Sequence, residues 1–356
     1  MKVLISAPSL DPGRNVSGVS TVVRHILSVL EDKIDFRHLK VGSETGTGRT
    51  GRTLRSLAAS AAAAGVIFGG RYDVFHSNTA LNPRSILRDA VLIVLARARR
   101  RPVVLHLHGG RYIHDDAPAF LRRIIGAMLA AAGRVIVLSG LEQSRLEANF
   151  PAARGKTEVI YNGVGIPDTP QIQRTTSDRL TIGFVGRLVD EKGIDIVLAA
   201  ADRLAADPRY LFLIFGDGPR RDDVLETAKN NPNIVYRGVF DSSQTEAVFA
   251  SIDVLVLPSR HGEGMPMAIL EAMAAGAVPY ATAISSVPEI IEDGVTGLLA
   301  PAEAADPLDR LATLADDAST LATMSRNAMS FAHTHFDARI NYSRLLPIYD
   351  AVTRRA

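Results

Sequence analysis

Cysteine is absent from this chain of 356 residues, and long apolar runs are absent as well. Without cysteine the protein has no disulfide, no thiolate metal ligand and no cysteine nucleophile. No apolar stretch approaches the roughly 20 residues that a membrane-spanning helix needs. The first segment, MKVLISAPSLDPG, offers only about five apolar residues before Pro8, too few for a signal peptide or an anchor. We therefore expect a cytoplasmic protein whose contact with a membrane, where there is one, is made from the surface.

Acidic residues are scarce in the first part of the chain, although the net charge of the whole is only +2. Residues 1–168 contain 23 Lys and Arg against 13 Asp and Glu, whereas the remaining residues contain 17 against 25. Two groups of arginines stand out: Arg97, Arg99, Arg100 and Arg101, then Arg122 and Arg123. They either complement the dipole at the end of a helix or dock anionic lipid head groups on the inner face of a membrane. No aromatic interleaving accompanies the charge, so nucleic acid is not an expected partner.

Short runs of Val, Ile and Leu alternate with helical stretches along nearly the whole chain, which predicts parallel sheets joined by right-handed crossovers. In the first half the predicted strands cover residues 2–8, 73–78, 102–109 and 134–139. In the second half they cover residues 156–163, 180–187, 210–218, 234–239, 254–259 and 297–301. The fold class is therefore α/β, and the length favours two doubly wound, Rossmann-like domains facing each other across a cleft.

Residues 163–179, rich in Pro, Thr, Ser and Gln, have the composition of a linker. We predict an N-terminal domain over residues 1–165, a C-terminal domain over residues 166–338, and a closing helix over residues 339–356. The alanine-rich residues 56–66 are predicted to be helical, because alanine is the best helix former. The Gly and Thr cluster at residues 42–52 predicts a loop.

Two carboxylates, Glu263 and Glu271, stand in the stretch HGEGMPMAILEAMAAG, whose residues from Met265 onward are otherwise small or apolar. Pro266 suits the first turn of a helix, so we expect the helix to begin there. The amides predicted to face an anion or a hydroxyl are those of Gly264, Met265 and Met267. Glu271 should point back toward these amides, because helical side chains tilt toward the N-terminus.

A buried carboxylate needs a partner, which for Glu271 is either an arginine with backbone amides or a vicinal diol such as that of a ribose. Other polar residues and glycines follow predicted strands, at the edge where open α/β sheets bind ligands. These are His108 with Gly109, Gly186 with Arg187, and Gly216. His106, two residues before His108 on the same strand, is predicted to be structural.

Seven features, in order along the chain, resemble the retaining nucleotide-sugar glycosyltransferases of the GT-B fold, family four. They are SGVSTVVRH, LHLHGG, VIYNGVG, FVGRLVDEKGID, FGDGP, the pair Glu263 and Glu271 with seven residues between them, and VPEIIEDGVTGLLAP. The resemblance implies that Glu271 holds the donor ribose, that Glu263 contacts hydroxyls of the transferred sugar, and that the backbone of residues 264–267 steadies that sugar. Arg187 and Lys192 match the family's basic pair over the diphosphate.

The same resemblance implies roles for several other residues. Ser17 and Gly18 match a glycine loop whose amides approach the phosphates or the acceptor, with an ordinary tight turn as the alternative. His108 matches a histidine near the reacting centre, and Asn162 matches the family's hinge between domains. Gly18, Gly186 and Gly216 would approach the donor, and Gly109 the acceptor. The closing helix would cross back to the N-terminal domain, which binds the acceptor, whereas the C-terminal domain binds the nucleotide sugar.

By this resemblance the protein is a metal-independent enzyme without a cofactor that transfers a hexose from a nucleoside diphosphate to an acceptor hydroxyl with retention. No Asp-x-Asp pair occurs for a divalent ion. The expected acceptor is a lipid-linked oligosaccharide in surface polysaccharide assembly. A sugar-nucleotide epimerase and a non-catalytic sugar-nucleotide binding protein are the alternatives. A dinucleotide oxidoreductase is disfavoured, since Arg221 stands where G-x-G-x-x-G needs its third glycine.

The chain departs from the family pattern before its Pro-Glu dipeptide, where the family often has two glycines. Here Ser285, Ser286 and Val287 precede Pro288. The run AGAVPYAT also places Pro279 and Tyr280 where small β-branched residues are usual. These departures bear on the identity of the donor and on the geometry of its phosphates.

Overall fold

The computed structural model describes residues 1–11, 17–42, 62–114, 117–166, 179–261 and 263–354. The chain forms two compact units, Met1–Gly163 with Ala338–Ala356, and Val164–Asp337. Residues 62–69 are helical, as predicted for the alanine-rich stretch. Its earlier residues, nearly all of the loop at 42–52 and most of the linker at 163–179 lie outside the described residues. Across the described residues, none of the helices is both long and apolar enough to cross a lipid bilayer.

The N-terminal unit is built on a parallel sheet of six strands in the order β2-β1-β3-β4-β5-β6. The strands are β1 (Lys2–Ala7), β2 (Asp35–Lys40), β3 (Val74–Thr79), β4 (Val103–Leu107), β5 (Arg134–Val137) and β6 (Thr157–Val159). Strands β3 and β4 are buried along their whole length; β4 is apolar except for His106, whereas β3 buries the polar residues of its second part, His76–Thr79. The order reverses between β1 and β3, so ligands are expected beyond the carboxyl ends of these strands.

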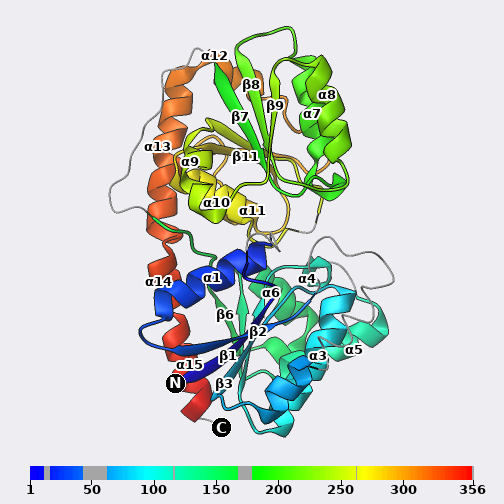
Figure 1. Ribbon diagram of the computed structural model, residues 1–356, viewed down its shortest axis with the longest axis vertical. Coiled ribbons are helices and arrows are strands. Elements are labelled where there is room, and N and C mark those ends of the chain that lie inside the picture. The colour runs from blue at the N-terminus through cyan, green and yellow to red at the C-terminus, as the bar shows by residue number, and fades with distance from the viewer. Residues whose placement is uncertain (12–16, 43–61, 115–116, 167–178, 262, 355–356) are drawn as a thin grey trace. The chain divides into compact units, whose positions relative to one another are not determined.

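Helices cover both faces of this sheet (Figure 1). They are α1 (Gly18–Leu30), α3 (Pro83–Ala98), α4 (Arg111–His114), α5 (Ala119–Ala131), α6 (Gly140–Asn149), α14 (Ala338–Ser343) and α15 (Leu345–Arg354), with a 3₁₀ turn at Pro151–Ala153. Helix α3 packs against α5, whereas α1 packs against α14. The C-terminal α15 packs against β3 and β4. Both ends of the chain therefore belong to this unit.

The C-terminal unit holds a second parallel sheet of six strands, in the order β12-β11-β10-β7-β8-β9. The strands are β7 (Leu180–Val185), β8 (Tyr210–Phe215), β9 (Ile234–Gly238), β10 (Val254–Leu257), β11 (Val278–Thr282) and β12 (Leu298–Ala300). This is the doubly wound order in which the chain proceeds outward from β7 to one side and then returns to the other. The switch point lies between β7 and β10.

The helices of this unit again lie on two faces of the sheet, with α7 and α8 on one and α9, α10 and α13 on the other (Figure 1). Their bounds are α7 (Ile194–Arg203), α8 (Arg221–Asn230), α9 (Thr245–Ala250), α10 (Met267–Ala274), α11 (Val287–Ile290), α12 (Leu311–Asp316) and α13 (Ala318–His335). Single 3₁₀ turns cover Asp190–Lys192 and Ser242–Gln244. The predicted α/β class with two doubly wound sheets is confirmed.

Three strands differ from the sequence prediction. Strands β2 and β11 were not predicted, because β2 has one buried apolar residue in DFRHLK and β11 contains Pro279. Proline is tolerated in this interior strand because β12 pairs with β11 only from Tyr280 onward. The predicted strand at residues 156–163, assigned to the second half, is shorter and forms β6 at the edge of the first sheet.

A tight contact within the N-terminal unit joins Gly163 to the returning C-terminal segment. A Cβ on Gly163 would lie 2.4 Å from the Cα of Ala338. The Gly163 amide donates to the Tyr342 hydroxyl at 2.9 Å, and His25 Nδ1 lies 2.9 Å from the Gly163 carbonyl oxygen. Only glycine allows two backbone segments to approach this closely.

A substitution at Gly216 tests how closely the loops at the carboxyl edge of the second sheet pack. Its φ is +133°, and a Cβ there would lie 1.8 Å from the Gly186 carbonyl oxygen. We expect Gly216→Ala to lower the free energy of unfolding by about 3 kcal/mol, because backbone strain and a clash add. Gly294→Ala is the control, since Gly294 has a φ of +77° but open space around it. Equal urea midpoints for the two variants would contradict the close contact.

Candidate active site

Two loops meet at the switch point of the second sheet, one after β7 and one after β10. The first contains Gly186, Arg187 and Lys192, and the second contains Ser259 and Glu263. The two strands are hydrogen-bonded neighbours, with Val254 opposite Ile182. Sequence positions about 70 residues apart are therefore brought together by the strand order. Doubly wound sheets bind their ligands beyond the carboxyl ends of such strands.

A buried ion pair joins these loops. The Lys192 ammonium contacts Glu263 Oε1, and the Ser259 hydroxyl donates to the same oxygen at 2.5 Å. The Glu263 side chain is only 5% exposed and that of Lys192 is 20% exposed. Two donors on this oxygen offset the cost of burying the carboxylate. The structure thus brings together two of the predicted site residues, Lys192 and Glu263.

Backbone contacts hold the same two loops against each other. The Arg260 amide donates to the Glu191 carbonyl at 3.0 Å, and the Arg260 guanidinium pairs with Asp195 at 2.6 Å. Gly193 has a φ of +72°, and a Cβ there would lie 2.1 Å from the Pro258 carbonyl oxygen. Glycine at this position therefore lets the β7 loop turn directly beneath the β10 loop. The position of Lys192 follows from this packing.

The predicted glycines Gly186 and Gly216 lie in contact at the ends of β7 and β8. The Gly186 amide donates to the Phe215 carbonyl at 3.1 Å, and the Gly216 amide donates to the Gly238 carbonyl at 2.8 Å. Arg187 directly follows Gly186 in the sequence, and its side chain is exposed. Its guanidinium is therefore accessible at the carboxyl edge of the sheet, on the same loop as Lys192.

Helix α10 begins at Met267, one residue later than predicted. Pro266 occupies the N-cap position with a ψ of 116°, so its backbone is extended rather than helical. Met265 and Met267 have buried side chains. Glu271 lies in the second turn of α10 and is partly buried. It is thus on the helix that follows the loop of Glu263.

The serines that replace the family's glycines have defined structural roles. Ser285 has a φ of +50°, a left-handed conformation that favours glycine and is uncommon for other residues. Ser286 is fully buried, and its hydroxyl donates to the Gly264 carbonyl. The segment between Glu263 and α10 is therefore tied to the loop after β11. Neither serine was predicted as a site residue.

A second group of polar residues lies at the switch point of the first sheet, and it includes His108. His108 Nε2 lies 2.7 Å from Asn78 Oδ1, while Asn78 Nδ2 donates to the Ser6 carbonyl at 2.9 Å. Because Asn78 uses its amide nitrogen on Ser6, its oxygen faces His108 and Nε2 must be the donor. Burial lowers the pKa of His108 to about 3, so the ring is neutral and Nδ1 is its acceptor nitrogen. Asn78 was not predicted, although it ends the strand motif DVFHSN.

His106 and His76 continue this cluster into the core. His76 Nε2 lies 3.3 Å from His106 Nδ1, and His76 Nδ1 lies 2.6 Å from the Tyr349 hydroxyl on α15. The rings of His106 and His108 have centroids 4.2 Å apart. Burial lowers the pKa of His76 to about 3 and that of His106 well below its usual value. These two neutral histidines join the sheet to the C-terminal helix, which agrees with the structural role predicted for His106.

The remaining predicted residues lie in the N-terminal unit. Ser17 is the extended N-cap of α1, without a capping bond from its side chain, and Gly18 begins the helix. Gly109 follows β4 with a φ of +70°, and its carbonyl accepts from the Leu81 amide at 3.0 Å. Asn162 is buried, and its carbonyl accepts from Asn341 at 3.4 Å.

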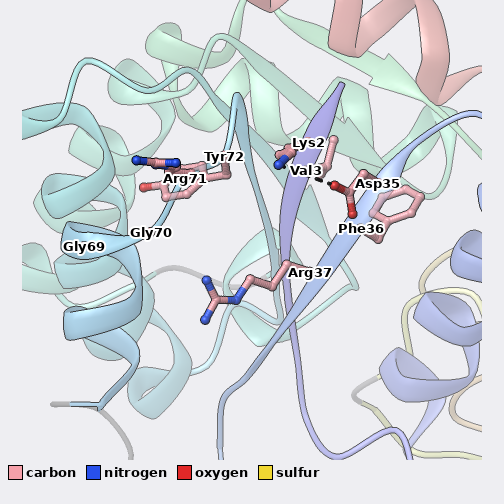
Figure 2. A pocket seen from close by; sticks show the side chains of 9 residues that line it. All are labelled: Lys2, Val3, Asp35, Phe36, Arg37, Gly69, Gly70, Arg71 and Tyr72. Carbon is pink, nitrogen blue, oxygen red and sulfur yellow. Dashed lines mark ion pairs between the residues drawn. The ribbon is translucent and has the colours of Figure 1, made fainter.

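A hollow of about 550 Å³ lies at the opposite, amino edge of the first sheet (Figure 2). Its walls include Lys2 and Asp35, which form an ion pair at 3.9 Å, and the exposed Arg37 extends over it. No predicted site residue lines this hollow. It therefore plays no part in the site at the carboxyl ends of the strands.

Two family descriptions match adjoining parts of the chain. "Glycosyltransferase Family 4" matches residues 16–166, and "Glycosyl transferases group 1" matches residues 179–317. The first contains His108, and the second contains Arg187, Lys192, Glu263 and Glu271.

Known proteins with similar sequences and structures include three that cover much of the chain. A 41.2 kDa protein of the cps region of Klebsiella pneumoniae is 27% identical over 64% of this chain and 65% of its own length. The alpha-D-kanosaminyltransferase of Streptomyces kanamyceticus is 26% identical over 72% of each chain. Anabaena Alr3699/HepE, solved in complex with UDP-glucose, is 19% identical with a TM-score of 0.74 over 99% of this chain and 100% of its own. The chain thus spans about two thirds of the length of the first relatives it matches.

The buried histidines predict how stability changes with pH. A histidine with a folded pKa near 3 binds no proton between that value and 6.5, whereas the unfolded chain does. The native state must therefore lose stability as pH falls below 6.5, by about 1.4 kcal/mol per pH unit for His76. We expect His76→Gln to be less stable than the parent at pH 7.5, with the difference shrinking at that rate toward pH 4. Urea titrations of the parent and of the variant at a series of pH values measure it.

Proposed function

The chain belongs to the glycosyltransferases of group 1 and family 4, and on this premise we propose that it transfers a hexose from a nucleoside diphosphate to an acceptor hydroxyl with retention. The observation that carries the proposal is the Lys192 and Glu263 ion pair at the switch point of the second sheet. A cation for a phosphate and an acid for sugar hydroxyls lie there within direct contact. Family membership favours transfer over epimerisation or binding without catalysis.

Breaking a glycosyl phosphate bond places negative charge on the departing diphosphate. Arg187 and Lys192 would stabilise this charge, because cations held in place by the fold act without reorganisation. An ammonium has three N–H donors, so a bond from Lys192 to Glu263 leaves donors for phosphate oxygens. These cations allow the reaction to proceed without a metal ion. Glu263 would position the sugar through its hydroxyls, and Glu271 would bind the ribose diol.

His108 offers a neutral acceptor nitrogen at the carboxyl end of β4. Its Nδ1 would accept a hydrogen bond from a hydroxyl of the donor sugar or of the acceptor near the reacting carbon. Asn78 would hold the ring in this tautomer. The departing phosphate oxygen would take the acceptor's proton in a front-face attack, so retention needs no covalent intermediate. The anomeric proton of the product, observed by NMR, tests retention directly.

The relatives suggest which substrates to try first. Alr3699/HepE was solved with UDP-glucose, which makes UDP-hexoses the first donors to test. The Klebsiella relative comes from a cps region, which supports an acceptor in surface polysaccharide assembly. We propose a lipid-linked oligosaccharide as the acceptor, with the protein acting peripherally on the cytoplasmic face of the membrane through its basic N-terminal half.

Binding of the donor to Glu271 is tested by thermal shifts with a panel of nucleoside diphosphates and their sugars. A donor at about 100 times its Kd should stabilise the native state by about 2.7 kcal/mol. Glu271→Ala should require at least about tenfold more donor for the same shift, because the diol loses its acceptor. Glu226→Ala, at an exposed position on α8, is the control. An unchanged titration for Glu271→Ala would remove this residue from the nucleotide site.

Lys192→Ala tests the cation at the diphosphate. We expect turnover to fall by about 10²–10³ with every acceptor, because the loss affects the leaving group common to all of them. Stability should also fall by about 3–5 kcal/mol, because Glu263 is left buried with Ser259 alone. Lys192→Arg keeps a charge at this position and should recover stability more than turnover.

The matched control for this variant is Arg260→Ala. It removes a neighbouring cation that is paired with Asp195 at the protein surface, and turnover should stay near that of the parent. Full activity of folded Lys192→Ala would mean that the diphosphate is bound elsewhere.

A further inference from the structure

Helix α3 exposes large apolar side chains on its outward face. Leu87, Val91 and Val94 are 49%, 57% and 65% exposed. They are spaced four and three residues apart, so they form a single stripe along the helix. The opposite side of α3 is apolar as well, and its Ile86, Leu92 and Ile93 are buried in the core. A helix at the surface of a soluble protein normally carries polar residues on its outer face.

The surroundings of the stripe are basic. Arg84 precedes it and Arg97 follows it on α3, and both are exposed. The neighbouring α5, which lies beside α3 (Figure 1), adds the exposed Phe120 and Arg123. Among the residues of α3 and α5 the one carboxylate is Asp89, which is buried and paired with Arg88 at 2.7 Å. Exposed charge on these two helices is therefore entirely positive.

We propose that the outward face of α3 is a membrane-docking surface that binds a bilayer containing anionic lipid. Exposed apolar residues with arginines around them match the interface of such a bilayer, where apolar side chains enter the acyl boundary and guanidinium groups meet phosphates. Leu87, Val91 and Val94 insert, and Arg84 and Arg97 contact the head groups at the two ends of the stripe. Long basic side chains reach the head-group level from a helix lying in the plane of the membrane.

Charge also distinguishes this occupant from two others. A second copy of the chain placed on the same face would bring Arg84 and Arg97 against the same cations of its partner. The chain's own residues 43–61 contain Arg49, Arg52 and Arg55 and would add like charge to the face. An anionic lipid surface supplies the opposite charge along the whole length of the stripe. The inference rests on the proposed function only in giving that surface a purpose, which is access to a lipid-linked acceptor.

The test is co-sedimentation of the full chain with vesicles of phosphatidylcholine mixed with phosphatidylglycerol, and with phosphatidylcholine vesicles alone. We expect binding to the mixed vesicles that weakens as salt is raised. The double variant Val91→Glu with Val94→Glu should bind at least about tenfold more weakly, because two charged groups must then enter the interface. Arg84→Glu with Arg97→Glu should abolish the preference for mixed vesicles. Ile340→Glu on α14 is the matched control, since Ile340 is 57% exposed like Val91.

Each outcome separates docking from the transferase proposal. Equal binding of the parent and of the Val91 and Val94 double variant would overturn the docking surface. So would a concentration-dependent dimer of the parent, seen by analytical ultracentrifugation, that this variant dissociates while vesicles stay unbound. Slow release of nucleoside diphosphate from a donor in solution should be unchanged in the variant, because α3 lies outside the donor site. Vesicle binding without any such release would leave the docking surface standing and count against the proposed function.

Discussion

A buried carboxylate that requires a cation beside it organises the C-terminal unit. Glu263 lies almost entirely inside the protein, and Lys192 and Ser259 are the groups that satisfy one of its oxygens. Loss of one partner from such a pair lowers the free energy of unfolding by about 3–5 kcal/mol. The ion pair therefore contributes strongly to holding the loops after β7 and β10 together. The strand order puts these loops side by side, and the glycines between them allow the close approach. Any ligand that needs a cation and an acid at one point finds both at the place where doubly wound sheets bind ligands.

The parts of this arrangement that follow from local chemistry were predictable from the sequence. Strands β7 and β8 are mostly apolar, and a glycine follows directly after each of them, Gly216 being required because a side chain there would meet the Gly186 carbonyl. Strand β2 was missed because only one of its residues is a buried apolar one, and β11 because it contains proline. The partners of the site residues were missed for another reason. Ser286 and Asn78 act through hydrogen bonds to residues distant in sequence, and Ser259 through a bond across the turn to Glu263; no periodic pattern reports such bonds.

The exposure of the outward face of α3 could not be predicted from the sequence either. The run AVLIVLA is apolar on every side, which in a sequence is the pattern of a fully buried helix. Its burial on one side only depends on where α5 and the sheet lie, and that is a property of the tertiary structure. The arginines near the end of α3 were visible in the sequence, with two interpretations that the sequence could not separate. The exposed valines between Arg84 and Arg97 favour contact with lipid, because complementing a helix dipole requires no apolar surface.

The serines before the Pro-Glu dipeptide affect the backbone geometry of the candidate site. A non-glycine residue in the left-handed region costs about 1–2 kcal/mol, so Ser285 is retained at some expense to stability. Its neighbour Ser286 donates to the Gly264 carbonyl, which fixes the plane of the peptide between Gly264 and Met265. In a trans peptide the N–H points opposite to the carbonyl, so this hydroxyl directs the Met265 amide away from the β11 loop. The amide that the family resemblance assigns to the transferred sugar is therefore oriented by a side chain that glycine could not supply. Where the family often has two glycines, the chain thus carries a specific hydrogen bond to the backbone that precedes α10.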